Sequence, residues 1–221
     1  MINKPDLDLA ATRAMEILLE HRITETPINP LPILLNFPHV RVMPYTRMAS
    51  EAGIDRRDLI PLFGNQDATT FHLDMPGMDD VKYVVVYNMR LPFDIVWRAV
   101  ARELGHIVLG HDGTRPEEVR NAEALCFAHH LLCPRALIHA IQESGTVITT
   151  EVLGNTTGCY ERCLIGMRRE PATHVPPELN RQIRAQFSDY ISDFLDFQAY
   201  LSLEDDSMIA NFGTFMDGYE E

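Results

Sequence analysis

The residues with the clearest chemical potential are Glu103 and His106, within the stretch RELGH at residues 102–106. In H-E-x-x-H helices, two histidines at i and i+4 bind one zinc ion, and the glutamate between them accepts the proton of the metal-bound water. A third ligand usually comes from a following helix, where Glu123 is the candidate. The sequence therefore offers Glu103 as a candidate base and His106 and Glu123 as candidate zinc ligands, although E-x-x-H by itself also occurs by chance in helices. Arg102 occupies the position of the first histidine.

Arg102 changes the chemistry that this helix predicts. A guanidinium group has no lone pair for a metal and stays protonated. Two unit charges ~4 Å apart repel by ~4 kcal/mol at an effective dielectric constant of ~20, and a dication roughly doubles this energy. We expect Arg102 to form a fork with the carboxylate of Glu123 or to donate near His106, so that its charge replaces that of the metal.

Cys126 offers a different way to complete a metal site. It lies three residues after Glu123 and therefore on the same helical face. A site of His106, Glu123 and Cys126 is conceivable if the arginine swings out, although a free cysteine is most often a small buried hydrophobe. His130 is ~10.5 Å along the helix from Glu123, which is too far to share one ion. His111 is expected to lie past the end of the first helix.

The helix that carries this motif, predicted over residues 92–110, has two different faces. One stripe is apolar and should pack on the core; it comprises Phe93, Trp97, Val100, Leu104 and Ile107. The opposite stripe mixes small, apolar and charged residues; it comprises Ile95, Ala99, Arg102 and His106, with Glu103 at its edge. Such a mixture favours the floor of a cleft over an ordinary solvent-exposed face.

The remaining elements indicate a mainly helical α+β chain. Strands are predicted at residues 40–43, 69–73 and 82–87, the last of which is rich in β-branched and aromatic residues. Further helices are predicted at residues 7–22, 31–36, 46–62, 117–132 and 178–201, with another inside 151–169. Pro134 is expected to end the helix at 117–132. The stripe of Phe187, Tyr190 and Phe194 should pack on its own domain, and the i, i+4 pair Cys159 and Cys163 is interpreted as helix packing rather than a metal or redox pair.

Composition excludes several classes of function. The formal net charge of −13 disfavours direct nucleic-acid binding and binding to an anionic membrane. No apolar run approaches the ~18 residues of a membrane-spanning helix, and the N-terminal residues do not resemble a signal peptide. We therefore expect a cytoplasmic protein with reduced cysteines. Residues 185–221 contain no Lys or Arg, so the chain ends in an acidic segment.

Several stretches together resemble the ImmA/IrrE-type metallopeptidases. They are YVVVYN at 83–88, ARELGHIVLGH at 101–111, EALCFAHHLLCP at 123–134, and AMEILL at 14–19 with PINP at 27–30. That family shows a strand ending in Asn, then a helix of the form AHELGHxxLGH, then a helix of the form EAxxFAxxLLxP. The resemblance covers roughly residues 7–170.

The resemblance implies a zincin-like core, with a small antiparallel or mixed sheet packed on the active-site helices. The predicted organisation is a metallopeptidase-fold domain at 1–170 and a helical, acidic extension at 171–221. Members of the family are zinc endopeptidases that typically cleave helix-turn-helix repressors of mobile elements or stress regulons. Three hypotheses follow: a degenerate peptidase that engages such a regulator, an active zinc endopeptidase using Glu103 and a rebuilt metal site, or an interaction module acting through the acidic C-terminal helix.

Overall fold

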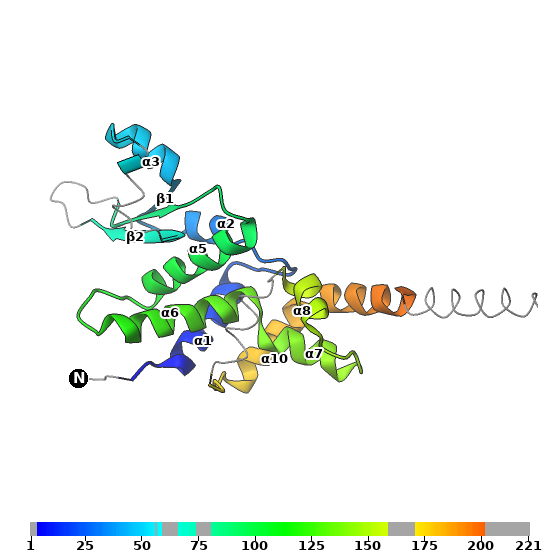
Figure 1. The fold of residues 1–221 in the computed structure, drawn as a ribbon. Helices are drawn as coiled ribbons and strands as arrows, with labels where there is room; N and C mark the ends of the chain where they lie inside the picture. Colours follow the sequence, from blue (N-terminus) through cyan, green and yellow to red (C-terminus); the bar gives the residue numbers. More distant parts are fainter. Residues whose placement is uncertain (1–3, 56, 59–65, 74–80, 159–170, 202–221) are drawn as a thin grey trace, which may run out of the picture.

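A three-stranded mixed sheet lies against a set of helices in this α+β chain (Figure 1). The computed structural model describes residues 4–55, 57–58, 66–73, 81–158 and 171–201. The strand order is β1-β3-β2, with β1 (Val40–Pro44) parallel to β3 (Tyr83–Tyr87) and β2 (Ala68–His72) antiparallel to it. All three strands lie within one residue of their predicted positions, because β-branched and aromatic residues concentrate there. The predicted α+β class is confirmed.

The helix that carries Glu103 and His106, α5, lies between the sheet and α6 (Figure 1). The helices are α1 (Leu7–Glu20), α2 (Pro30–Leu35), α3 (Tyr45–Ala52), α5 (Phe93–Val108), α6 (Glu117–Leu132), α7 (Arg135–Glu143), α8 (Thr150–Thr157) and α10 (Pro177–Gln186). The prediction of 117–132 matches α6. Helix α7 was not predicted, because Pro134 ends α6 and also occupies the N-cap position of the next helix.

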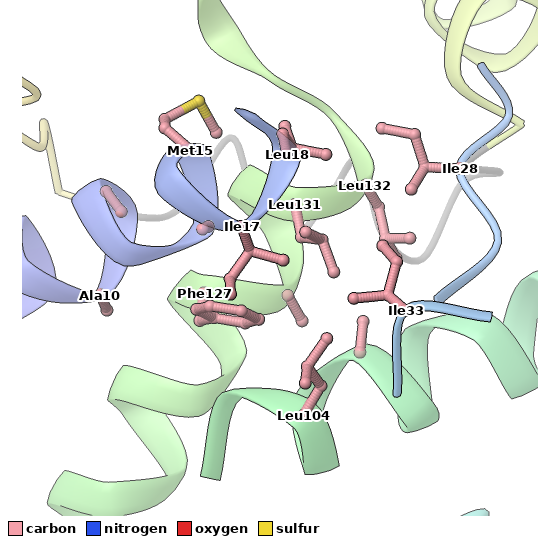
Figure 2. Close-up of a cluster of buried hydrophobic side chains, with 14 of the residues drawn as sticks. Ala10, Met15, Ile17, Leu18, Ile28, Ile33, Leu104, Phe127, Leu131 and Leu132 are labelled. Carbon is pink, nitrogen blue, oxygen red and sulfur yellow. The ribbon is translucent and has the colours of Figure 1, made fainter. Parts of the chain in front are cut away.

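The main hydrophobic core is formed by α1, α5 and α6. Leu18, Leu104 and Phe127 are fully buried there, and Figure 2 shows the side chains of the three helices meeting. Gly105 permits the close approach of α5 to α6: a Cβ atom at this position would lie 3.0 Å from the carbonyl oxygen of Ala124 and 3.0 Å from the Phe127 ring. This contact fixes the spacing between the two helices that carry the predicted site.

The two predicted faces of α5 are partly as expected. Val100 and Leu104 are fully buried, but Phe93 is 55% exposed, so the prediction that it packs on the core is wrong. Phe93 lies in the first turn of α5, where its ring contacts that of Trp97 at a centroid distance of 5.0 Å. Ala99, on the opposite stripe, is buried as well, because α5 is covered by the sheet on one side and by helices on the other.

The C-terminal helical region begins inside the main body. Ile183 and Phe187 are fully buried in the main core, and the helical conformation resumes over residues 188–201. Tyr190 and Phe194 pack against the same core, which confirms that this stripe packs on its own domain. The first part of the predicted extension is therefore built into the body.

Some predictions fall outside the described residues, namely those for Cys159, Cys163 and residues 202–221. In the part of the chain that the structure describes, no single helix has the length and apolarity to cross a membrane, and the bent pair of α6 and α7 meets that test only when the two are taken together.

Candidate functional site

A cleft of about 210 Å³ lies between α5, β2 and the start of α6. Its walls include Arg102, Glu103 and His106 from α5, Thr70 from β2, and His111 from the connection to α6. The C-terminal part of the predicted mixed stripe thus faces a cleft, but Ile95 and Ala99 do not line it, and Ile107 of the predicted core-facing stripe does. Glu123, the other predicted metal ligand, does not line this cleft and is only 2% exposed.

The predicted base, Glu103, is held by its neighbours through both carboxylate oxygens. Arg102 donates to Oε1 from Nη2 at 2.8 Å and from Nε at 3.1 Å. Thr70 donates to Oε2 from its hydroxyl at 2.7 Å. Since Glu103 is only 4% exposed, these are hydrogen bonds of a buried, charge-paired group rather than of a solvated one.

The partner of Arg102 differs from the expected one. We predicted a fork with Glu123 or a donor position near His106, but Arg102 pairs with Glu103 and donates to the Ala68 carbonyl at 3.2 Å. Strand β2 supplies both this carbonyl and Thr70, so it draws the arginine and the base to the same side of α5. The expected place beside Glu123 is occupied by another arginine.

Arg115, which precedes α6, forms the fork on Glu123. Its Nη1 and Nη2 atoms lie 2.8 and 2.7 Å from the two carboxylate oxygens. The backbone N–H of Asp6 donates to Oε1 at 2.7 Å, and the His111 ring approaches Oε2 at 3.0 Å. Burial raises the pKa of Glu123, but the hydrogen bonds from Asp6, Arg115 and His111 outweigh it and leave the pKa below its usual value.

His111 reaches this network because the chain turns back after α5. It lies past the helix end, as predicted, but Gly110 adopts φ 63°, and the His111 N–H donates to the His106 carbonyl at 3.0 Å. The His111 side chain is only 1% exposed. Its ring lies between the other two groups, with its Nδ1 2.9 Å from Nδ1 of His106 and its Nε2 facing Glu123. The predicted ligands His106 and Glu123 are therefore linked through His111.

The proton positions follow from this hydrogen-bond network. A carboxylate only accepts, so His111 carries its proton on Nε2 and accepts through Nδ1 when neutral. His106 must then donate from Nδ1, which leaves the lone pair on its Nε2. Burial, with the nearby charges of His111, Arg102 and Arg120, lowers the pKa of His106 to about 4, so this ring is neutral at pH 7.

The pKa of Tyr45 is affected by the negative charges near the cleft. Its hydroxyl donates to the Gln66 carbonyl at 2.9 Å. Burial, reinforced by the negative charges of Glu103 and Asp67, raises the pKa of Tyr45 to about 12. This phenol therefore stays protonated and donates to Gln66, which lines the cleft.

The donor groups do not fit the zinc site that the resemblance implies. Cys126 is fully buried in the main core, where its thiol approaches the Leu7 carbonyl at 3.5 Å, so it cannot complete a site with His106. Both oxygens of Glu123 already accept hydrogen bonds, and Arg102 has no lone pair to offer a metal. Among the described residues, no three His, Cys, Asp or Glu side chains gather in a way that could hold a metal ion.

Four residues of this site were missed from the sequence: Thr70, His111 as a buried link, Arg115 and Asp6. The pair Gly110-His111 carried a usable signal, because glycine after a helix predicts a left-handed turn that reverses the chain. Arg115, Thr70 and Asp6 carried none, since each reaches α5 or α6 from another element.

No protein-family model, no curated protein and no solved structure matches this chain. The resemblance to ImmA/IrrE-type metallopeptidases therefore stays a prediction carried by the motifs at 83–88, 101–111 and 123–134. The function is inferred below from the geometry of the cleft.

Proposed function

We propose that this chain is a degenerate ImmA/IrrE-type peptidase that binds a segment of a regulator protein in its cleft without hydrolysing it. The observation that carries the proposal is the state of Glu103, whose two carboxylate oxygens accept hydrogen bonds from Arg102 and Thr70. A general base must be able to contact the water whose proton it accepts. Three hydrogen bonds already occupy three of the ~4 acceptor sites of this carboxylate, so a water must compete with an ion pair and a hydroxyl for it.

The two arginines supply the positive charge that a zinc ion would bring. Arg102 neutralises Glu103, and Arg115 neutralises Glu123. Each carboxylate is buried and would be costly without a cationic partner. Both buried carboxylates are therefore charge-balanced without a metal, and zinc is not part of the proposed function.

Binding of an extended protein segment is supported by the position of β2. Within the described residues, β2 pairs only with β3 and forms one edge of the sheet. Thr69, Thr70 and His72 of this strand line the cleft. An extended peptide can add to a sheet edge through main-chain hydrogen bonds, with side-chain pockets providing specificity. A helix-turn-helix repressor is the partner class that the family resemblance suggests.

The loss of hydrolysis is tested by incubating the purified chain with casein and one equivalent of zinc, and by measuring bound zinc after dialysis. We expect no fragments and no stoichiometric zinc. Zinc-dependent cleavage that disappears in Glu103→Gln would contradict the proposal and establish the active-peptidase alternative.

A restoration experiment tests how far the site has diverged. Arg102→His alone should gain little zinc, because Arg115 still holds both oxygens of Glu123. The double variant Arg102→His with Arg115→Ala should bind zinc more tightly than either single variant. Arg98→His, one turn earlier on α5, is the matched control and should gain none.

Peptide binding is tested with a random peptide library displayed on phage and selected on the wild-type chain. Asn121→Trp, at the exposed mouth of the cleft, should lower the affinity for the selected peptides by roughly tenfold or more, which corresponds to ~1.4 kcal/mol. Glu118→Trp, exposed one turn earlier on α6 and outside the cleft wall, is the control. Equal binding by both variants would contradict binding in the cleft. Loss of binding only on deletion of residues 195–221, which spares Tyr190 and Phe194 of the core, would favour the C-terminal interaction hypothesis.

A further inference from the structure

A second and larger cavity, of about 420 Å³, lies between α1, α6, α7 and the start of α10. It shares no lining residue with the cleft described above. Small-molecule sites generally occupy ~300–1,000 Å³, and the cleft is below that range whereas this cavity is within it. The sequence motifs did not point to this region.

Arginine side chains concentrate around this cavity although the chain as a whole carries a net charge of −13. Arg135, Arg181 and Arg184 line it, and Glu143 is the acidic residue among the lining residues. Arg184 pairs with Glu143, but their side chains are 42% and 60% exposed. Exposed pairs of this kind are held weakly, so an incoming anion can replace the glutamate.

Arg135 is the arginine most available to a ligand. It makes no hydrogen bond or ion pair with another residue in the described ranges, and it is only partly exposed. A guanidinium group presents a planar fork of N–H donors that matches carboxylate and phosphate oxygens. The same charge repels metal cations, which excludes them as occupants.

The inner wall of the cavity combines apolar surface with one buried polar side chain. Met15, Ala136 and Val175 supply the apolar part. His130 is 2% exposed, and its Nε2 lies 3.0 Å from the hydroxyl of Thr173, which also lines the cavity. Its Nδ1 has no hydrogen-bond partner in the described structure. Such a buried, unpaired atom is rare and indicates a missing partner.

We propose that this cavity binds a small organic anion, whose carboxylate or phosphate group pairs with Arg135 and Arg184 while its apolar body lies against Met15, Ala136 and Val175. His130, whose Nε2 lies 3.0 Å from the Thr173 hydroxyl, forms part of the inner wall beside the ligand. This inference does not depend on the proposed function of the cleft, because the two sites use different residues.

The test uses two fluorescent probes that differ chiefly in charge: anilinonaphthalene sulfonate and neutral N-phenylnaphthylamine. The wild-type chain should bind the sulfonate at one saturable site. The double variant Arg135→Gln with Arg184→Gln should bind the sulfonate roughly tenfold or more less tightly, since a charge-assisted hydrogen bond contributes ~1.5–3 kcal/mol. Affinity for the neutral probe should change by less than about twofold.

Arg41→Gln is the matched control, because Arg41 forms an exposed ion pair with Glu51 far along the chain from the cavity. Each variant is used only if its urea midpoint matches that of the wild type. Unchanged sulfonate affinity in the double variant, or an equal loss for both probes, would overturn the proposal. Competition by benzoate or by phenyl phosphate then distinguishes a carboxylate ligand from a phosphate ligand.

Ala136→Leu provides an independent test of location, since it adds volume to the apolar wall. Both probes should then bind less tightly. Ala122→Leu, on α6 outside the cavity wall, should leave both affinities unchanged. Equal affinities in the two leucine variants would place the probes elsewhere and overturn the assignment.

Discussion

The cleft and the larger cavity lie at different points along the same helix, α6. The two regions differ in whether the charged and polar groups near them have hydrogen-bond partners. Near Glu123, the carboxylate is bound by Arg115, His111 and the Asp6 backbone. Near His130, one ring nitrogen has no partner, and Arg135 has none among the described residues. A network whose members are all paired contributes to folding, whereas a guanidinium without a partner beside a cavity is available to a ligand.

The largest expected effect is the loss of the paired network around Glu123, which lies beneath the cleft wall. Glu123→Ala leaves Arg115, His111 and the Asp6 N–H without their acceptor, and should lower the free energy of unfolding by about 3–5 kcal/mol. Urea denaturation measures this change. Glu51→Ala, which removes an exposed partner of Arg47, should shift the midpoint far less. Equal shifts would mean that the Glu123 network does not stabilise the fold.

Low pH should lower the stability of the fold through His130, which lies on α6 at the larger cavity. Burial, with Arg135 and His129 nearby, lowers the pKa of His130 to about 4 from 6.5. As the pH falls below 6.5, the unfolded chain takes up this proton first, so stability decreases between pH 6.5 and about 4. The contribution is about 3 kcal/mol. His130→Gln should make the stability profile measured by urea titration less steep across this range, with the part due to His106 remaining, and the exposed His139→Gln should leave the slope unchanged.

A smaller effect is expected from Arg115, the arginine of the network around Glu123. Arg115→Gln removes the fork but leaves His111 and Asp6 on Glu123, so the loss should be about 1–3 kcal/mol. Arg115→Lys keeps the charge without the fork, so its free energy of unfolding should lie between those of the wild type and Arg115→Gln. Arg184→Gln, at the exposed pair beside the cavity, should change the urea midpoint little. A larger loss for Arg184→Gln would reverse the comparison between the two regions.

The smallest effect concerns the hydroxyl that holds Glu103. Thr70→Val removes a 2.7 Å hydrogen bond to this carboxylate and should cost about 1 kcal/mol. Thr69→Val, the adjacent residue of β2 with no such bond, is the matched control in thermal unfolding. If the two valine variants melt together, Thr70 does not restrain the base.

Most elements could be predicted because their signals are local. The run Tyr83–Tyr87 consists only of β-branched and aromatic residues, and the stretch 117–132 has a clear start and end. Helix α7 was missed because a proline can end one helix and begin the next. Phe93 was assigned to the core because periodicity gives the direction of a side chain without showing how far the neighbouring elements extend.

The sequence by itself determined that Glu103 and His106 share a helix, that Arg102 stands where a ligand should, and that Glu123 follows on the next helix. Only the tertiary structure decided which charges meet. Arg102 pairs with Glu103, and β2 supplies Thr70 and the Ala68 carbonyl beside them. Arg115 pairs with Glu123 in the part of the chain that follows the turn at Gly110. Partner choice among buried charges depends on distances between elements far apart in sequence, and helical spacing carries no information about those distances.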